Sequence, residues 1–100
     1  MVEKELERKL KKRVEELGCL CLKFESPGYT GVPDRIILLP GGSVVFVEMK
    51  APGRKERPRQ KLVHRIFRML GFKVMSPIDS EAGIDHVCSV CKAMMRGSQE

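Results

Sequence analysis

The sequence predicts a single α/β domain over residues 1–100, in which one mixed sheet is flanked by helices in the order αβββαβα. Three observations support this prediction. The chain has 100 residues, which suits one domain and is too short for two. Its apolar fraction of 42% is ordinary for a globular protein. Long segments with helical apolar spacing alternate with short apolar runs bounded by turn residues.

The N-terminal half is predicted to form a helix followed by three strands. In residues 2–17 the apolar positions recur at three- and four-residue intervals, at Val2, Leu6, Leu10, Val14 and Leu17. Gly18 follows as a helix stop signal. Short apolar runs at residues 19–24, 34–39 and 44–50 are typical of strands. The turn residues at 40–43 predict that the last two strands form a β-hairpin.

The C-terminal half is predicted to contain a helix, a short strand and a last helix. The second helix should run from about 58 to 70, with the apolar stripe Leu62, Val63, Ile66, Phe67 and Leu70. Residues 72–75 are expected to form a short fourth strand. The last helix, about 80–95, is expected to face inward with Ile84, Val87, Cys88, Cys91 and Met94 or Met95. Residues 96–100 are expected to be a frayed tail.

The charge of the chain favours a polyanionic partner. Nineteen Lys and Arg against thirteen Asp and Glu give a net charge of +6 and a pI near 9.4. Nucleic acid is the first candidate and an anionic membrane surface the second. No apolar run approaches the roughly 18 residues of a membrane span, and the N-terminus has no secretory pattern. We therefore expect a soluble cytoplasmic, nucleoid-associated protein with no membrane segment and no small-molecule cofactor.

The four cysteines allow two interpretations. They occur as two close pairs, Cys19 with Cys21 and Cys88 with Cys91. Four thiolates could bind zinc and organise an interaction domain, although the first pair is spaced more tightly than the usual zinc knuckle. Alternatively, each pair occupies the buried face of one strand or one helix as small core residues. The spacing favours core packing, and disulfides are the least favoured in a reducing compartment.

The third strand ends in charged residues that predict a catalytic site. Glu48 and Lys50 are two apart, so they point to the same face of a strand. A three-residue loop at 40–42 would place Asp34 opposite Glu48, whereas a two-residue loop would place it opposite Met49, on the wrong face. Two carboxylates and an ammonium group suit phosphodiester hydrolysis with Mg²⁺ or Mn²⁺. The alternative is an exposed Glu48–Lys50 ion pair with Asp34 capping a turn.

These residues also carry a family resemblance. Pro33-Asp34 followed fourteen residues later by Glu48-Met49-Lys50 resembles the PD-(D/E)xK pattern of restriction-endonuclease-like nucleases. The longer strings at 31–35, 45–53 and 57–60 are similar to a narrower group, the virus-type replication-repair nuclease (VRR-NUC) family. The similarity covers nearly the whole chain, less distinctly beyond Gly71. It implies a restriction-endonuclease-like core and a metal-dependent DNA nuclease, and the compact form resembles phage-encoded members.

The resemblance implies roles for individual residues. Asp34 and Glu48 correspond to the metal-binding carboxylates, and Lys50 to the catalytic lysine. The backbone carbonyl of Met49 is a further implied metal ligand. Glu7 matches the acidic residue of the first helix, which reaches the metal directly or through water, although it could instead be a solvated helix residue. Gln60 matches the glutamine that supports the lysine or the scissile phosphate, although it could simply cap its helix.

A basic rim is expected to bind the DNA backbone. Its residues are Lys23, Tyr29, Arg35, Arg54, Lys55, Arg57, Arg59, Lys61 and His64, of which His64 could also be structural. No sequence-reading helix is evident, so we expect structure-selective cleavage of four-way (Holliday) junctions or other branched DNA. A homodimer would present two active sites to such a substrate. The alternatives are a non-catalytic nucleic-acid-binding module and a restriction-type endonuclease.

Overall fold

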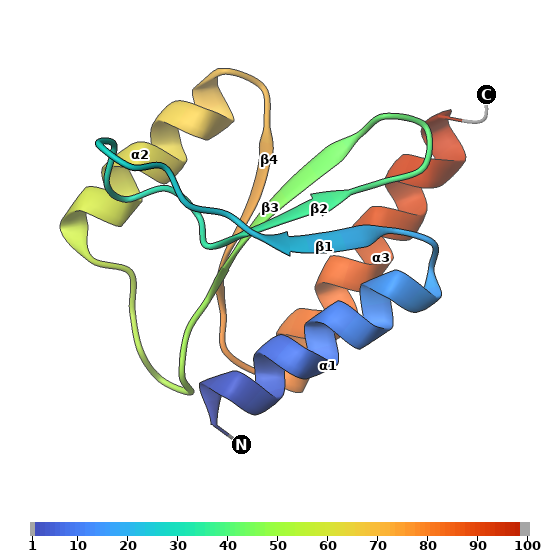
Figure 1. The fold of residues 1–100 in the computed structure, drawn as a ribbon, viewed down its shortest axis with the longest axis horizontal. Helices are drawn as coiled ribbons and strands as arrows, with labels where there is room; N and C mark the ends of the chain where they lie inside the picture. The colour runs from blue at the N-terminus through green and yellow to red at the C-terminus, as the bar shows by residue number, and fades with distance from the viewer. Residues whose placement is uncertain (1, 99–100) are drawn as a thin grey trace.

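A computed structural model describes residues 2–98 of the chain and confirms the predicted element order (Figure 1). The helices are α1 (Glu3–Glu16), α2 (Pro58–Met69) and α3 (Glu81–Ser98). The strands are β1 (Leu20–Lys23), β2 (Arg35–Leu38), β3 (Val44–Met49) and β4 (Lys73–Ile78). No helix among residues 2–98 has both the length and the apolar character needed to cross a membrane.

The four strands form one mixed sheet in the order β1-β2-β3-β4. β1 pairs with β2 and β2 pairs with β3 in antiparallel fashion. The loop at 24–34 connects the first pair, and the short turn at 39–43 connects the second. β4 lies parallel to β3, so the chain must cross over between them, and α2 forms that crossover. In Figure 1, α1 and α3 lie side by side, whereas α2 lies apart from them, next to β4.

The main core lies between the sheet and the helices α1 and α3. Alternate strand residues such as Ile37, Val45 and Val47 point into it and are fully buried. The helices contribute Leu6, Leu10, Val14, Ile84 and Val87, each at most 1% exposed. All four cysteines are free and buried in the same core, which confirms the core-packing interpretation of the two pairs.

The opposite, outer face of the sheet is only partly covered. Phe46 contacts the rings of Phe24, Phe67 and Phe72 at centroid distances of 5.5, 5.0 and 5.8 Å, so α2 covers β3 and β4. The part formed by β1 and β2 leaves Leu20, Leu22 and Leu38 between 37% and 47% exposed. Three helical core predictions are therefore wrong. Because α2 buries Val63 and His64 instead, it leaves Leu62 and Leu70 exposed. Val2 lies exposed before the first residue of α1.

Two predicted boundaries near the C-terminus are also corrected. β4 continues to Ile78 and includes Pro77. Proline has no backbone N–H to donate to a neighbouring strand, and it is tolerated here because β4 is an edge strand. Helix α3 continues to Ser98, so the frayed tail predicted from residue 96 is wrong for residues 96–98. The remaining two residues of that predicted tail, 99 and 100, lie outside the described part of the chain.

Candidate active site

The β2–β3 hairpin brings the two predicted carboxylates together. Arg35 pairs with Val47, and one step further the same register places Asp34 opposite Glu48. The amide of Leu39 donates to the carbonyl of Ser43 at 2.9 Å and closes a three-residue loop at 40–42. The three-residue loop that the site required is therefore confirmed.

Asp34 lies directly before the first residue of β2, in a partly buried position. Its Oδ1 accepts a hydrogen bond of 3.0 Å from the backbone amide of Met49, which ties it to β3. Burial raises the pKa of Asp34 from its usual 3.8 to about 6. The hydrogen bond from Met49 opposes this change in the pKa, whereas the neighbouring carboxylates of Glu48 and Glu7 reinforce it. A cation beside Asp34 would relieve this repulsion.

Glu48 is a buried carboxylate, with an exposed fraction of 3%. Its Oε2 atom receives a hydrogen bond of 3.0 Å from Gln60 Nε2 and lies 3.2 Å from Lys50 Nζ. Its Oε1 atom is buried and has no hydrogen-bond partner among residues 2–98. The Glu48–Lys50 pair is therefore not the exposed ion pair of the alternative interpretation, because the two side chains are only 4% and 15% exposed.

Glu7 reaches the edge of this cluster from α1. Its Oε2 lies 3.0 Å from Nη2 of Arg35, whose Nη1 also donates to the carbonyl of Asp34 at 2.9 Å. The Arg35 side chain is only 14% exposed and is engaged in these contacts. The structure thus places Arg35 as a link between α1 and β2, next to Asp34 rather than on the outer basic rim where we expected it.

The donor set at this end of the hairpin fits a hard divalent cation. Two carboxylates meet across the hairpin, one of them with an unpartnered buried oxygen, and such oxygen donors are the ones that Mg²⁺ prefers. Within residues 2–98, no group of three or more His, Cys, Asp or Glu side chains is already assembled around a metal position. Glu7 and the Met49 carbonyl therefore remain predicted ligands.

The basic rim is largely where the sequence placed it. Arg54, Lys55, Arg57, Arg59 and Lys61 are exposed on the loop after β3 and the start of α2. A cleft of about 430 Å³ beside the site is lined by Glu3, Lys50, Ala51, Arg54, Lys55 and Arg57. Arg59 stacks over the exposed ring of Tyr29 at 5.1 Å, and its Nε donates to the carbonyl of Thr30. The loop before β2 is thereby fixed against α2.

Gly31 is required for this close approach of the loop to α2. Its φ of +91° is in the left-handed region, which favours glycine. A Cβ atom there would lie 2.9 Å from the Arg59 carbonyl oxygen and 3.0 Å from a methyl group of Val63. A side chain at this position would push Tyr29 and the loop away from the start of α2.

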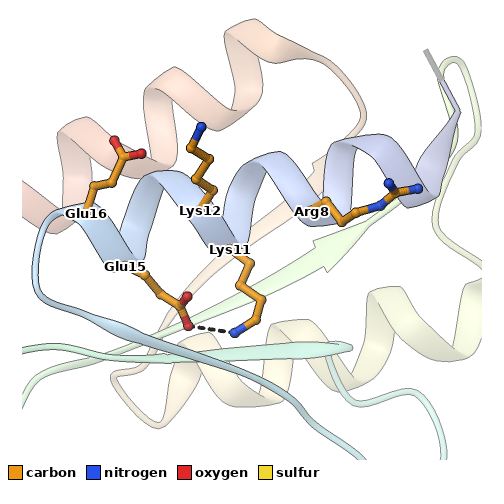
Figure 2. Close-up of a pocket in the computed structure, with 5 residues that line it drawn as sticks. All are labelled: Arg8, Lys11, Lys12, Glu15 and Glu16. Atoms are coloured by element: carbon orange, nitrogen blue, oxygen red, sulfur yellow. Dashed lines mark hydrogen bonds and ion pairs between the residues drawn. The ribbon is translucent and has the colours of Figure 1, made fainter.

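A second basic groove borders the site on the side of α1. It has a volume of about 370 Å³ and is lined by Glu7, Arg8, Lys11, Cys21, Leu22, Lys23 and Arg35. Figure 2 shows an adjacent hollow on α1 lined by Arg8, Lys11, Lys12, Glu15 and Glu16. There Lys11 and Glu15 form an ion pair of 2.7 Å, as expected of a solvated helix face. The groove continues the positive charge to Lys23, whereas in the hollow two glutamates offset most of the charge of three basic residues.

His64 does not lie where we predicted it. Its side chain is completely buried, so it cannot contact a backbone phosphate, and the predicted contact with DNA is wrong. Its Nδ1 instead bonds to the carboxylate of Glu56, and its Nε2 faces Glu48. Glu56 was not among the predicted site residues, because this pair joins a loop to a helix, a contact that leaves no periodic signal in the sequence.

Two comparisons with known proteins identify the family of the chain. No family model matches the chain. The chain is 44% identical over 73 residues to "Putative nuclease p44" of Acyrthosiphon pisum secondary endosymbiont phage 1, covering 73% of this chain and 78% of that protein. A solved structure titled "VRR_NUC domain" superimposes with a TM-score of 0.81 at 33% identity, covering 87% of this chain and 94% of the other. The chain therefore belongs to the VRR-NUC family of nucleases.

Proposed function

We propose that this nuclease is a metal-dependent DNA endonuclease in which Asp34 and Glu48 hold Mg²⁺ or Mn²⁺. One observation carries the proposal: the hairpin register sets these two carboxylates opposite each other, with Lys50 3.2 Å from Glu48. An ordinary surface ion pair would leave Glu48 exposed, but its side chain is only 4% exposed. A module that only binds DNA gains nothing from buried carboxylates, because they repel phosphate and are costly to bury. Glu7 and the Met49 carbonyl complete the proposed metal ligands, directly or through water.

The side chains then have separate roles in hydrolysis. The bound ion supplies Lewis-acid stabilisation of the negative charge that develops on the phosphate. Lys50 Nζ orients the attacking water or stabilises the same charge as a point donor. Gln60 holds the Oε2 atom of Glu48 by its 3.0 Å hydrogen bond and so fixes the carboxylate beside Lys50. The oxygen of the attacking water forms a new bond to phosphorus and the bond from phosphorus to the departing oxygen breaks, while the water releases one proton to solvent and the departing oxygen takes one up.

The DNA-binding surface in this proposal lies on both sides of the carboxylates. The exposed cations after β3 contact the phosphates on one side, and the groove lined by Arg8, Lys11 and Lys23 contacts them on the other. Contacts of this kind are largely independent of base sequence and sensitive to salt. They suit a substrate recognised by shape, so four-way junctions or other branched DNA are the proposed substrates.

A homodimer is part of the same proposal. The outer face of the sheet has an uncovered apolar row in which Leu20 pairs with Leu38 and Leu38 with Val44. Phe72, 47% exposed, lies directly before the β4 residue that pairs with Val45, and so it extends the row. A second copy would cover this row and give a branched substrate two active sites.

The proposal is tested by cleavage of labelled four-way junction, splayed-arm and plain duplex DNA, with Mg²⁺, Mn²⁺ or EDTA. Wild type is compared with Asp34→Ala and Lys50→Ala, and Lys92→Ala on the exposed surface of α3 is the matched control. We expect metal-dependent cutting of the junction by wild type and the control, and a loss of roughly 10³-fold or more in the two site variants. DNA binding without cutting under either metal would instead establish the non-catalytic module.

A further inference from the structure

The buried His64 and the partly buried Glu56 form a pair that faces the proposed metal ligand Glu48. His64 lies one turn after Gln60 in α2 and is completely buried. Its Nδ1 atom bonds to the carboxylate of Glu56, in the loop before the helix. Its Nε2 atom lies 3.9 Å from Oε1 of Glu48. The three side chains therefore form a line from the loop through α2 to the end of β3.

The two facing atoms are two of the three buried side-chain polar atoms that make no hydrogen bond within residues 2–98, and the third is Ser76 Oγ. Both Glu48 Oε1 and His64 Nε2 are buried and make no hydrogen bond within residues 2–98. The other Glu48 oxygen, Oε2, already has Gln60 and Lys50. A separation of 3.9 Å exceeds the roughly 3.2 Å limit of a good N–H···O bond. Because Nδ1 donates to Glu56, Nε2 can donate to Oε1 when both ring nitrogens carry a proton, and a shift of about 1 Å in either side chain would then bring the two atoms within hydrogen-bond distance.

A purely structural histidine explains less of this arrangement. Such a residue would need only its contact with Glu56, and its second nitrogen would be expected to find a partner or solvent. Here that nitrogen is directed at the one open oxygen of Glu48 instead. Glu56 fixes the ring by holding the opposite nitrogen. Carboxylate–histidine pairs of this kind orient groups at metal sites, and their loss typically costs about 10–100-fold in metal affinity.

We propose that His64, oriented by Glu56, is a positioning residue that holds Oε1 of Glu48 so that its carboxylate is set for the metal ion. The proposal rests on the proposed function, because it needs Glu48 to be a metal ligand. His64 does not touch DNA or the reacting atoms. Its loss should therefore weaken metal binding and leave the chemical step intact once the metal is saturating.

The test is the Mn²⁺ dissociation constant, measured by titration calorimetry on the full chain. His64→Gln keeps a donor near the Nε2 position, which faces Glu48. His64→Asn keeps one near the Nδ1 position, which faces Glu56. Both put an amide in the same buried place, so each controls for the packing change of the other. We expect His64→Asn to raise the dissociation constant about 10–100-fold and His64→Gln to stay close to wild type.

Cleavage at saturating Mn²⁺ is the second readout, and we expect it to return to near wild type in His64→Asn. Glu56→Ala, in the loop outside the helix, should weaken Mn²⁺ binding in the same direction, and it tests the pair without altering the buried position. Equal affinities in wild type, His64→Asn and Glu56→Ala would overturn the positioning role alone. Wild type that neither binds Mn²⁺ nor cuts DNA would overturn the proposed function together with it.

Discussion

The inner core and the site at the end of β3 are both shielded from water, yet the core consists of apolar side chains and the site of charged and polar ones. In the core, Leu10, Ile37 and Val45 have no exposed surface and need nothing beyond close packing. At the site, Glu48 is 3% exposed and His64 is not exposed at all, and each retains an unsatisfied polar atom. Burying such atoms is unfavourable unless partners are supplied. The core therefore stabilises a fold in which the site is held at a cost.

The largest effect on stability should come from the core. Leu10→Ala removes a fully buried side chain from α1, so we expect the free energy of unfolding to fall by about 2–5 kcal/mol. Urea unfolding followed by circular dichroism measures this change. Leu62→Ala is the matched control, since Leu62 is 45% exposed on α2 and its loss leaves no cavity. An equal fall in the free energy of unfolding of the two variants would contradict the difference between the buried Leu10 and the exposed Leu62.

At the site, a substitution that removes a carboxylate charge should raise the free energy of unfolding instead of lowering it. The pKa of Asp34 is raised to about 6, so the folded state keeps its proton where the unfolded state has lost it. The contribution of Asp34 to stability therefore falls as the pH rises from about 4 to about 6. Without metal and above this range, Asp34→Asn should raise the free energy of unfolding by about 1–2 kcal/mol, after allowance for partial exposure.

Urea unfolding in EDTA at pH 4 and pH 8 tests this prediction for Asp34→Asn. The substituted amide keeps the oxygen that accepts the Met49 hydrogen bond, so the comparison isolates the charge. The stabilisation should be present at pH 8 and largely absent at pH 4. An added divalent ion should remove the advantage, because it stabilises the wild type through the ionised carboxylate. A variant less stable than wild type at pH 8 would contradict the prediction.

The uncovered outer face should have the smallest effect on the fold. Leu20→Lys places a charge on an exposed position of an edge strand, so the free energy of unfolding of the monomer should change by less than about 0.5 kcal/mol. The same change should shift the protein from dimer to monomer in light scattering, whereas Ser89→Lys on the exposed surface of α3 should not. A dimer that survives Leu20→Lys would place the interface elsewhere.

Features with a local cause could be predicted from the sequence. The element order and the pairing of Asp34 with Glu48 follow from apolar spacing and from the length of one turn. The exposure of Leu62 and Leu70 could not be predicted, because an apolar stripe does not reveal how far the neighbouring sheet extends over it. The Glu56–His64 contact was missed for a related reason. It depends on how a loop folds back on a helix, which no spacing encodes.

The two hydrogen bonds of the Gln60 side chain affect what fraction of the molecules has Glu48 held in place. Its Oε1 accepts from the amide of Arg57 at the start of α2 at 2.9 Å, while its Nε2 donates to Glu48. One amide group thus joins the first turn of a helix to the carboxylate of Glu48, the proposed metal ligand. When that turn frays, the Glu48 carboxylate loses the hydrogen bond from Gln60. The apparent affinity for the proposed metal ion should then be reduced in proportion to the fraction of molecules in which the turn is intact. Exchange of the Arg57 amide proton with solvent would then report how often this turn opens and leaves the Glu48 carboxylate without its Gln60 donor.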